Sequence, residues 1–233
     1  MRTLFLMLLA TACQGARPAP ATRGLADVEA ALLAPRPLRI GFEVVAEGAV
    51  AVEVSGTLLL DGGARSRLDV AGTFQGEAVE VTRVCDGQRC GGRIAGEAQP
   101  PTAQPGGVRE AWVLGFTRMG ILHNVAVATG GGAPDHAGGD VGAWLRAENA
   151  THDDEWLSFD LVVGGEPSAR ARLRLGEEGW PARREQSVAF PEGEMRVLET
   201  YVMSRPAGSL AGRFEVPEPS HLDAPDAGAP GGE

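Results

Sequence analysis

The sequence predicts a mainly β domain of the α+β class: a curved antiparallel sheet, or incomplete β-barrel, lidded by one or two helices. Apolar and polar residues alternate along many short segments, which is the period of a half-buried strand. Clusters of Gly, Asp, Glu and Pro separate these segments and supply the turns that antiparallel hairpins need. Aromatic residues make up only 5% of the chain, so the core must be built mainly from Val, Leu and Ala, which suits strands.

The domain is expected to begin with a helix and a meander of about five strands. Apolar residues from Leu25 to Leu33 fall at helical spacing and Pro35 ends the run, which predicts a helix at about 25–34. Turn sequences such as Asp61-Gly62-Gly63 separate the alternating segments that follow. The expected strands are 38–45, 50–60, 65–70, 79–84 and 89–94.

The second half is expected to add one helix and a second meander. A Pro/Gly-rich segment at 100–107 should interrupt the sheet before a helix at about 108–122, and 130–142 is typical of a Gly-rich loop. Residues 144–152 fit a helical turn or an edge strand equally well. The remaining expected strands are 157–163, 170–175, 181–190, 194–204 and a short one at 213–216. Together these elements predict one strongly curved sheet with helices covering its concave face.

Both ends of the chain are expected to lie outside this domain, which we place at 25–216. A charged start, an apolar run too short to span a bilayer and small residues before Cys13 predict a lipoprotein signal peptide at 1–12, with Cys13 acylated. The alternative is an ordinary secretory signal cleaved nearby, which also exports the protein. Residues 13–24 are expected to form a flexible tether, and 217–233 a disordered acidic tail.

Charge argues against nucleic acid as a partner. The formal net charge is -10 and no basic stripe interrupts the sequence, so a phosphate backbone would be repelled. All 21 basic residues are Arg, which a GC-rich genome explains more simply than a functional need for guanidinium groups. Attachment to a membrane is therefore expected to come from acylated Cys13 or from apolar contact.

The two other cysteines predict a disulfide in a hairpin. Removing Cys13 for acylation leaves an even pair, Cys85 and Cys90, on either side of the turn signal Asp86-Gly87. An oxidising compartment preserves such a bridge. The alternative, a zinc site, would need two further ligands at comparable spacing, and the sequence offers none.

The order of elements resembles the LolA/LolB superfamily of periplasmic lipoprotein carriers and outer-membrane lipoprotein receptors. The residues that carry the resemblance are 50–74, the helical segment 108–122, and the closing stretch from Gly179-Trp180-Pro181 through Tyr201. The resemblance implies an incomplete antiparallel barrel lidded by helices around an apolar cavity for acyl chains, without catalytic apparatus. Gln14 after Cys13, compared with the common lipoprotein sorting rule, favours the outer membrane, facing the periplasm.

A half-closed sheet cannot fill its concavity with its own side chains, so something else must fill it. Helix 108–122 either packs there permanently, as ordinary core, or is displaced by lipid; the sequence does not decide between these. The apolar residues expected to line the binding site are Val52, Val54, Leu58, Leu68, Val70, Trp112, Phe116, Met119, Leu161, Val163 and Leu173.

Glu199 is the one charged residue expected in this site. It alternates with apolar residues along the strand from Met195 to Met203. If that face turns inward, the carboxylate needs a partner such as Arg184 on the adjoining strand, and the pair would fix a polar head group. The alternative places Glu199 at the rim of the sheet or on an exposed face.

No pattern predicts catalysis, a metal or a cofactor. The sequence lacks G-x-S-x-G, H-E-x-x-H, P-loop and dinucleotide-binding motifs. His152-Asp153-Asp154-Glu155, and Asp135-His136 with Asp140, have the chemistry of metal ligands but fall where solvated polar residues are expected. His123-Asn124 follows the second expected helix and would interact with its C-terminal dipole.

The sequence leaves two functions open. The first is a membrane-anchored envelope protein that binds lipid or an acylated lipoprotein in an apolar cavity. The second is a structural or assembly lipoprotein that binds another envelope protein and whose interior is simply core.

Overall fold

The computed structural model describes residues 24–153, 155–176 and 178–218. Within them, the helices are α1 (Leu25–Leu33), α2 (Val108–Leu114), the π-helix η1 (Gly115–Met119), α3 (Ile121–Thr129) and α4 (Val141–Trp144). The first strands are β1 (Leu38–Gly48), β2 (Val52–Leu60), β3 (Ser66–Phe74), β4 (Glu77–Cys85), β5 (Arg89–Ile94) and β6 (Glu97–Ala103). The later ones are β7 (Leu145–Asp153), β8 (Trp156–Val163), β9 (Glu166–Leu175), β10 (Pro181–Phe190) and β11 (Gly193–Ser204).

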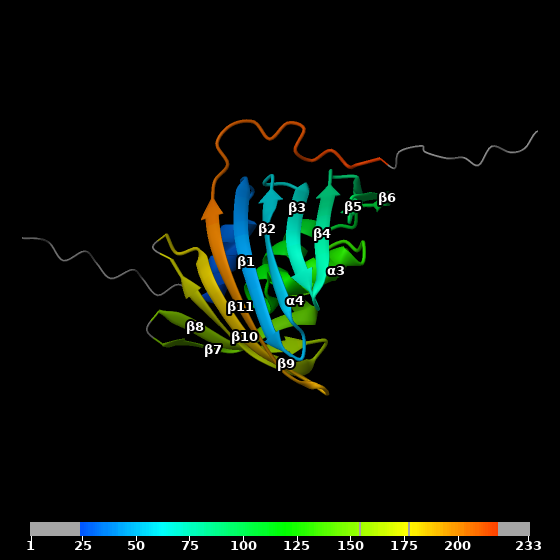
Figure 1. Ribbon diagram of the computed structural model, residues 1–233. Helices are drawn as coiled ribbons and strands as arrows, with labels where there is room; N and C mark the ends of the chain where they lie inside the picture. The colour runs from blue at the N-terminus through cyan, green and yellow to red at the C-terminus, as the bar shows by residue number, and fades with distance from the viewer. Residues whose placement is uncertain (1–23, 154, 177, 219–233) are drawn as a thin grey trace, which may run out of the picture.

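All these strands form one antiparallel sheet that is not closed into a barrel. Its order is β6-β5-β4-β3-β2-β1-β11-β10-β9-β8-β7, so β6 and β7 are its two edges (Figure 1). Each half is a meander of neighbours along the chain. The two halves are joined by β1 and β11, which pair from Arg39↔Ser204 to Gly48↔Met195. The predicted single sheet is therefore confirmed.

Alternation of apolar and polar residues gives the sheet two distinct faces. Along β1 the side chains of Leu38, Ile40, Phe42 and Val44 are buried, while the residues between them point outward. The helices lie on the buried face, behind the strands in Figure 1, and the other face of β1 and β11 is open. The helices thus cover the concave face, as the sequence predicts.

The first meander has six strands rather than five, because β6 extends the sheet where an interruption was predicted. Pro100 and Pro101 lie in this strand. Proline lacks the N–H that an inner strand would need, but an edge strand tolerates it because one side of its backbone has no neighbour. The prediction for 100–107 is therefore wrong for its first residues, and Pro/Gly content there marks an edge instead of a loop.

The predicted helix 108–122 is wrong as a single element. The chain forms α2 and η1, breaks at Gly120, and continues as α3 to Thr129. Gly120 has a φ of 95°, in the left-handed region that favours glycine, which ends the first helical run. The undecided segment 144–152 contains both alternatives, since the end of α4 leads directly into the edge strand β7.

The predicted short strand at 213–216 is wrong. Residues 211–214 form a turn, and Phe214 and Val216 are buried against the outer side of Val84. Their apolar spacing reflects this packing. Cys85 and Cys90 face each other in the β4–β5 ladder and form a disulfide, as predicted.

Predictions for the two ends fall outside the described residues. They concern the signal peptide at 1–12, acylated Cys13, nearly all of the tether, and the tail from 219 onward. Among the helices that the structure describes, none combines the length and apolar character needed to cross a bilayer.

Candidate functional site

The candidate site is the concave face of the sheet together with the helices that cover it. Ten of the twelve residues predicted to line it are buried there, and Met119 and Val163 are partly buried. They divide between two apolar clusters. Val52, Val54, Leu58, Leu68, Val70, Trp112 and Phe116 belong to the larger one, under α1, α2 and α3. Leu161 and Leu173 are in the smaller one around β8 and β9, against which Met119 and Val163 pack.

In this structure the covering helices occupy the concave face. The Phe116 ring lies edge-on to Tyr201 of β11, with centroids 4.6 Å apart. Trp112 is 1% exposed and its indole N–H donates to Ser66 Oγ at 3.0 Å. The concave face is therefore filled by side chains of the covering helices.

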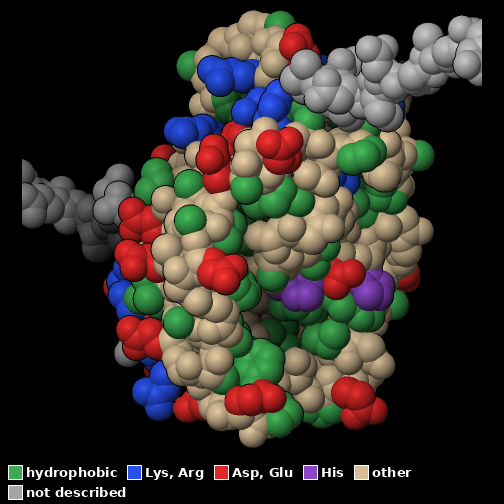
Figure 2. All heavy atoms as spheres, turned by 45° about the vertical axis from the view of Figure 1, so that its right-hand side comes forward, with side chains coloured by type: hydrophobic (Ala, Val, Ile, Leu, Met, Phe, Trp, Pro, Cys, Tyr) green, Lys and Arg blue, Asp and Glu red, His purple; other side chains and the backbone are tan. Residues whose placement is uncertain are grey.

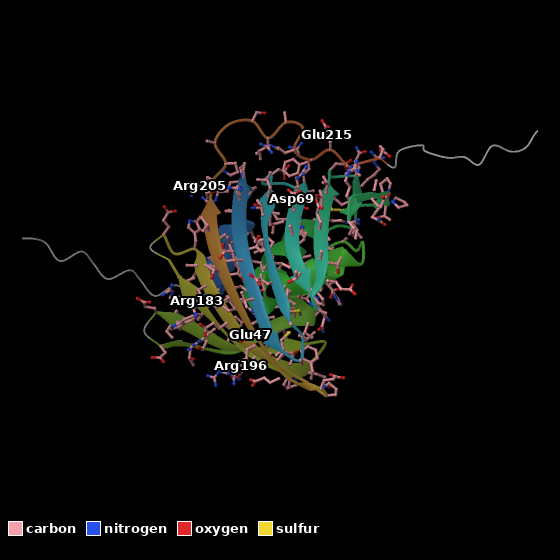
Figure 3. All side chains as sticks on the ribbon, in the orientation of Figure 1. Glu47, Asp69, Arg183, Arg196, Arg205 and Glu215 are labelled. Atoms are coloured by element: carbon pink, nitrogen blue, oxygen red, sulfur yellow. A yellow bond between two sulfur atoms is a disulfide. The ribbon has the colours of Figure 1, made fainter. Side chains whose placement is uncertain are left out.

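The opposite face carries an open trough of about 640 Å³. Arg183, Arg196 and Glu47 line it and point away from the helices, from β10, β11 and β1 (Figure 3). The trough is lined by both signs of charge and therefore differs from the apolar concave face.

Glu199 lies inside the site, beside Arg184. The two residues are directly opposite each other on β11 and β10, both are 0% exposed, and Arg184 Nη1 is 3.7 Å from Glu199 Oε2. The structure thus shows the inward orientation, and the alternative at the rim is wrong. A buried pair of this kind is stable only when further hydrogen bonds satisfy its remaining atoms.

The helical cover, which consists of α2, η1 and α3, supplies part of those hydrogen bonds. The backbone N–H of Leu122 donates to Glu199 Oε1 at 3.0 Å, and Arg184 Nη2 donates to the carbonyl of Arg118 at 2.5 Å. Tyr201 O–H also donates to Glu199 Oε2. Burial raises the pKa of the Tyr201 phenol well above its ordinary value, and the nearby Glu199 carboxylate raises it further.

Gly120 is the point at which the cover touches this pair. A Cβ at residue 120 would lie 2.6 Å from Glu199 Oε2 and 2.7 Å from Arg184 Nη1. Backbone conformation and close approach thus both require glycine here. This role was not predicted from the sequence, although a glycine between two apolar helical runs is a signal that would have found it.

A second group of polar contacts, an ion pair with hydrogen bonds, joins the cover to α1. Arg118 binds Glu29 through both carboxylate oxygens, at 2.7 and 2.8 Å, and Thr117 Oγ1 donates to Glu29 Oε1 at 3.0 Å. Arg118 Nη1 also donates to the carbonyl of Leu145, at the start of β7. This pair was not predicted either. Its signal was Glu29 on the apolar stripe of a helix, at a position where a carboxylate needs a partner.

His123 lies in the first turn of α3, so the predicted interaction with a helix C-terminus is wrong. Its Nε2 is 2.9 Å from Asp135 Oδ2, and His136 Nδ1 is 3.1 Å from Asp135 Oδ1. The His136 ring stacks on Trp144 at 3.6 Å. Figure 2 shows two histidines on either side of an acidic side chain on this face of the molecule.

Asp135 is held by these histidines rather than grouped with Asp140. Partial burial would raise the pKa of Asp135, but the hydrogen bonds with His123 and His136 outweigh it and leave the pKa below its ordinary value. Asp140 instead caps α4 by accepting from the N–H of Ala143 at 2.9 Å. Among the residues that the structure describes, no group of three or more His, Cys, Asp or Glu side chains is placed to hold a metal ion.

No protein-family model matches the chain, and no curated protein matches it. Solved structures that resemble it include a LolA superfamily protein from Nitrosomonas europaea, with 11% identity, a TM-score of 0.39, and coverage of 81% of this chain and 96% of that one. An uncharacterized conserved protein from Thermus thermophilus has 13% identity, a TM-score of 0.41 and coverage of 83% and 93%. LprF from Mycobacterium bovis has 8% identity, a TM-score of 0.35 and coverage of 79% and 92%.

Proposed function

We propose that this chain is a non-catalytic lipoprotein of the bacterial envelope that binds acyl chains of a lipid or lipoprotein on its concave sheet face. The observation that carries the proposal is that short helices, rather than further strands, cover the apolar side of the sheet. Buried apolar side chains on both halves of the sheet, in two clusters, are covered by short helical segments that do not pair with its strands.

The cover is suited to movement. It consists of two helical runs, α2 with η1 (7 and 5 residues) and α3 (9 residues), and runs this short are marginal as isolated helices. Gly120 interrupts them and Gly130, Gly131 and Gly132 follow them. Moving these pieces breaks none of the ladder hydrogen bonds of the sheet, so the binding surface would persist when the cover opens.

An acyl chain would offset part of the free energy that opening the cover costs. Opening exposes the apolar faces of the sheet and cover, and an acyl chain laid on the sheet restores roughly 0.8 kcal/mol for each methylene it buries. Hydrogen bonds to Arg184, Glu199 and Glu29 make closure specific, because each of these side chains gains a partner from the cover only when the cover is in place.

Membrane attachment belongs to the same proposal. Acylation of Cys13 after removal of residues 1–12 would anchor the domain through the tether, on the periplasmic side of the outer membrane. Partners would then be lipid or acylated lipoproteins, with no cofactor.

The second candidate is an assembly lipoprotein whose interior is permanent core and whose surface binds another envelope protein. The close packing of Phe116, which is 0% exposed, favours it. Detergent-free native mass spectrometry separates the two: bound lipid, or uptake of a fluorescent fatty acid, supports the first, and clean protein without uptake supports the second.

Phe116→Arg sharpens the test. If Phe116 belongs to a movable cover, the variant keeps the circular dichroism spectrum of the sheet and loses fatty-acid uptake. Global unfolding of the variant, combined with no uptake by the unmodified protein, would mean that the helices are ordinary core and would end the lipid-binding proposal.

A further inference from the structure

The chain does not end with the sheet but returns across its outer face as an arm, residues 205–218. Phe214 and Val216 of the arm are 4% and 9% exposed and pack on Val84 of β4. Arg89 binds Glu218 at 2.8 Å. A Cβ at Gly91 would lie 2.5 Å from Val216 Cγ1, so β5 is shaped to receive the arm.

Between the arm and the outer face of β1, β2 and β3 lies a pocket of about 480 Å³. Four arginines line it: Arg39 from β1, Arg67 from β3, and Arg205 and Arg213 from the arm. Asp69 is the one acidic residue in its lining, so four arginines against one aspartate leave a surplus of three positive charges. Figure 3 shows Arg205 and Asp69 at the same end of the sheet, and in Figure 2 blue side chains gather below the loop at the top.

The surplus is not neutralised by neighbouring acids. Asp69 is already bound by Arg67, at 2.7 and 2.9 Å, and accepts a further hydrogen bond from Thr82 at 3.0 Å. Among the described residues, no carboxylate lies within 4.0 Å of a guanidinium nitrogen of the three other arginines. The pocket is thus locally positive in a protein whose net charge is -10.

The geometry points to a binding site for a phosphate-bearing anion in this pocket, separate from the concave face. Guanidinium groups present planar pairs of N–H donors that match phosphate oxygens, and several of them around one anion compensate its double charge. The hydroxyls of Thr57, Ser204 and Ser209 add neutral hydrogen-bonding groups to the lining. The pocket is large enough for a phosphate carried on a glycerol or sugar, and two sources supply that chemistry: a lipid head group and a soluble phosphate ester.

The test uses the full chain with Cys13→Ser, so that the proposed lipid anchor makes no contribution. The first measurement is inorganic pyrophosphate binding by calorimetry at low ionic strength. The other measures sedimentation with phosphatidylcholine vesicles that do or do not contain phosphatidic acid. Arg205→Ala combined with Arg213→Ala removes two exposed cations of the pocket.

Arg170→Ala combined with Arg196→Ala is the matched control, because it removes the same charge from exposed sites that line the trough on the same face. We expect the pocket variant to weaken binding by about tenfold or more and the control to change it less than about twofold. Binding of pyrophosphate alone identifies a soluble phosphate ester, and binding that needs phosphatidic acid vesicles identifies a head group. No binding in either measurement, or equal losses of binding in both variants, would overturn the proposal.

Discussion

Glu29 and Arg118 form a two-point ion pair that joins the first helix of the domain to the π-helix in its cover, 89 residues later. Their side chains are only 8% and 17% exposed, so the pair lies in a low-dielectric environment. It connects the helix that follows the proposed membrane tether with the element that would have to move.

Glu29→Gln should loosen the cover. The substitution keeps the shape of the side chain but removes its charge, leaving Arg118 without its counter-ion. We expect the free energy of unfolding to fall by about 1–3 kcal/mol and fatty-acid uptake to become faster. Denaturant unfolding and stopped-flow fluorescence measure the two effects. Unchanged uptake kinetics with the expected loss of stability would mean that the pair is purely structural.

Gly120→Ala should disturb the cover more than an equally strained glycine does elsewhere. Gly96 in the β5–β6 turn has a φ of 84° and nothing within 4 Å of an added Cβ, whereas Gly120 has a φ of 95° and faces Glu199 and Arg184. Gly96→Ala is therefore the matched control and should cost about 1 kcal/mol. We expect Gly120→Ala to cost several times as much and to increase amide exchange in residues 115–129. Equal effects of the two variants would contradict the close contact between Gly120 and the buried ion pair.

Tyr201 should govern stability at high pH. The chain contains a single Tyr and no Lys, so above pH 10 few other groups titrate. Because burial keeps the folded-state pKa of Tyr201 well above 10.0, the unfolded chain loses this proton first and stability falls as pH rises past 10.

The expected slope is about 1.4 kcal/mol per pH unit for one proton. Tyrosinate absorbance should appear only as the protein unfolds, and Tyr201→Phe should flatten the slope. A tyrosinate signal that develops in the folded protein near pH 10 would show that the phenol is accessible to solvent rather than buried.

Loss of the disulfide should have a local effect. Cys85 and Cys90 close a very short loop, so chain entropy predicts a contribution of only about 2 kcal/mol. In the double variant Cys85→Ala/Cys90→Ala we expect faster amide exchange in β4 and β5, with protection retained in β9 and β10. Loss of protection throughout the sheet would mean that this hairpin supports the whole fold.

Sequence patterns predicted the strands well, because alternation records which face of each strand is buried. Alternation also predicted that Glu199 could face the interior, where a carboxylate needs a partner. Arg184 was predicted as that partner because its strand adjoins that of Glu199. Whether the concave face contains a cavity was not predictable in this way. Whether Trp112 and Phe116 fill the concavity depends on how far the sheet curves, which no local pattern encodes.

The features that were not predicted depend on contacts between distant segments. Gly120 looked like a feature of a helix, but its conformation is tied to Glu199, and Glu29 meets Arg118 only in the folded chain. The basic pocket was not predicted for the same reason. Arg39, Arg67, Arg205 and Arg213 form no stripe in the sequence, and the fold brings them together.

The adjacency of β1 and β11 has a consequence for biogenesis. Strands that begin about 150 residues apart along the chain pair at the centre of the sheet, so forming this ladder requires a large loop to close. If the chain is exported with its N-terminus first, as the proposed function requires, one edge of β1 stays unpaired until β11 has followed. During that interval an apolar strand is open to mispairing, and we expect folding yield to depend on a chaperone that shields β1 until translocation is complete.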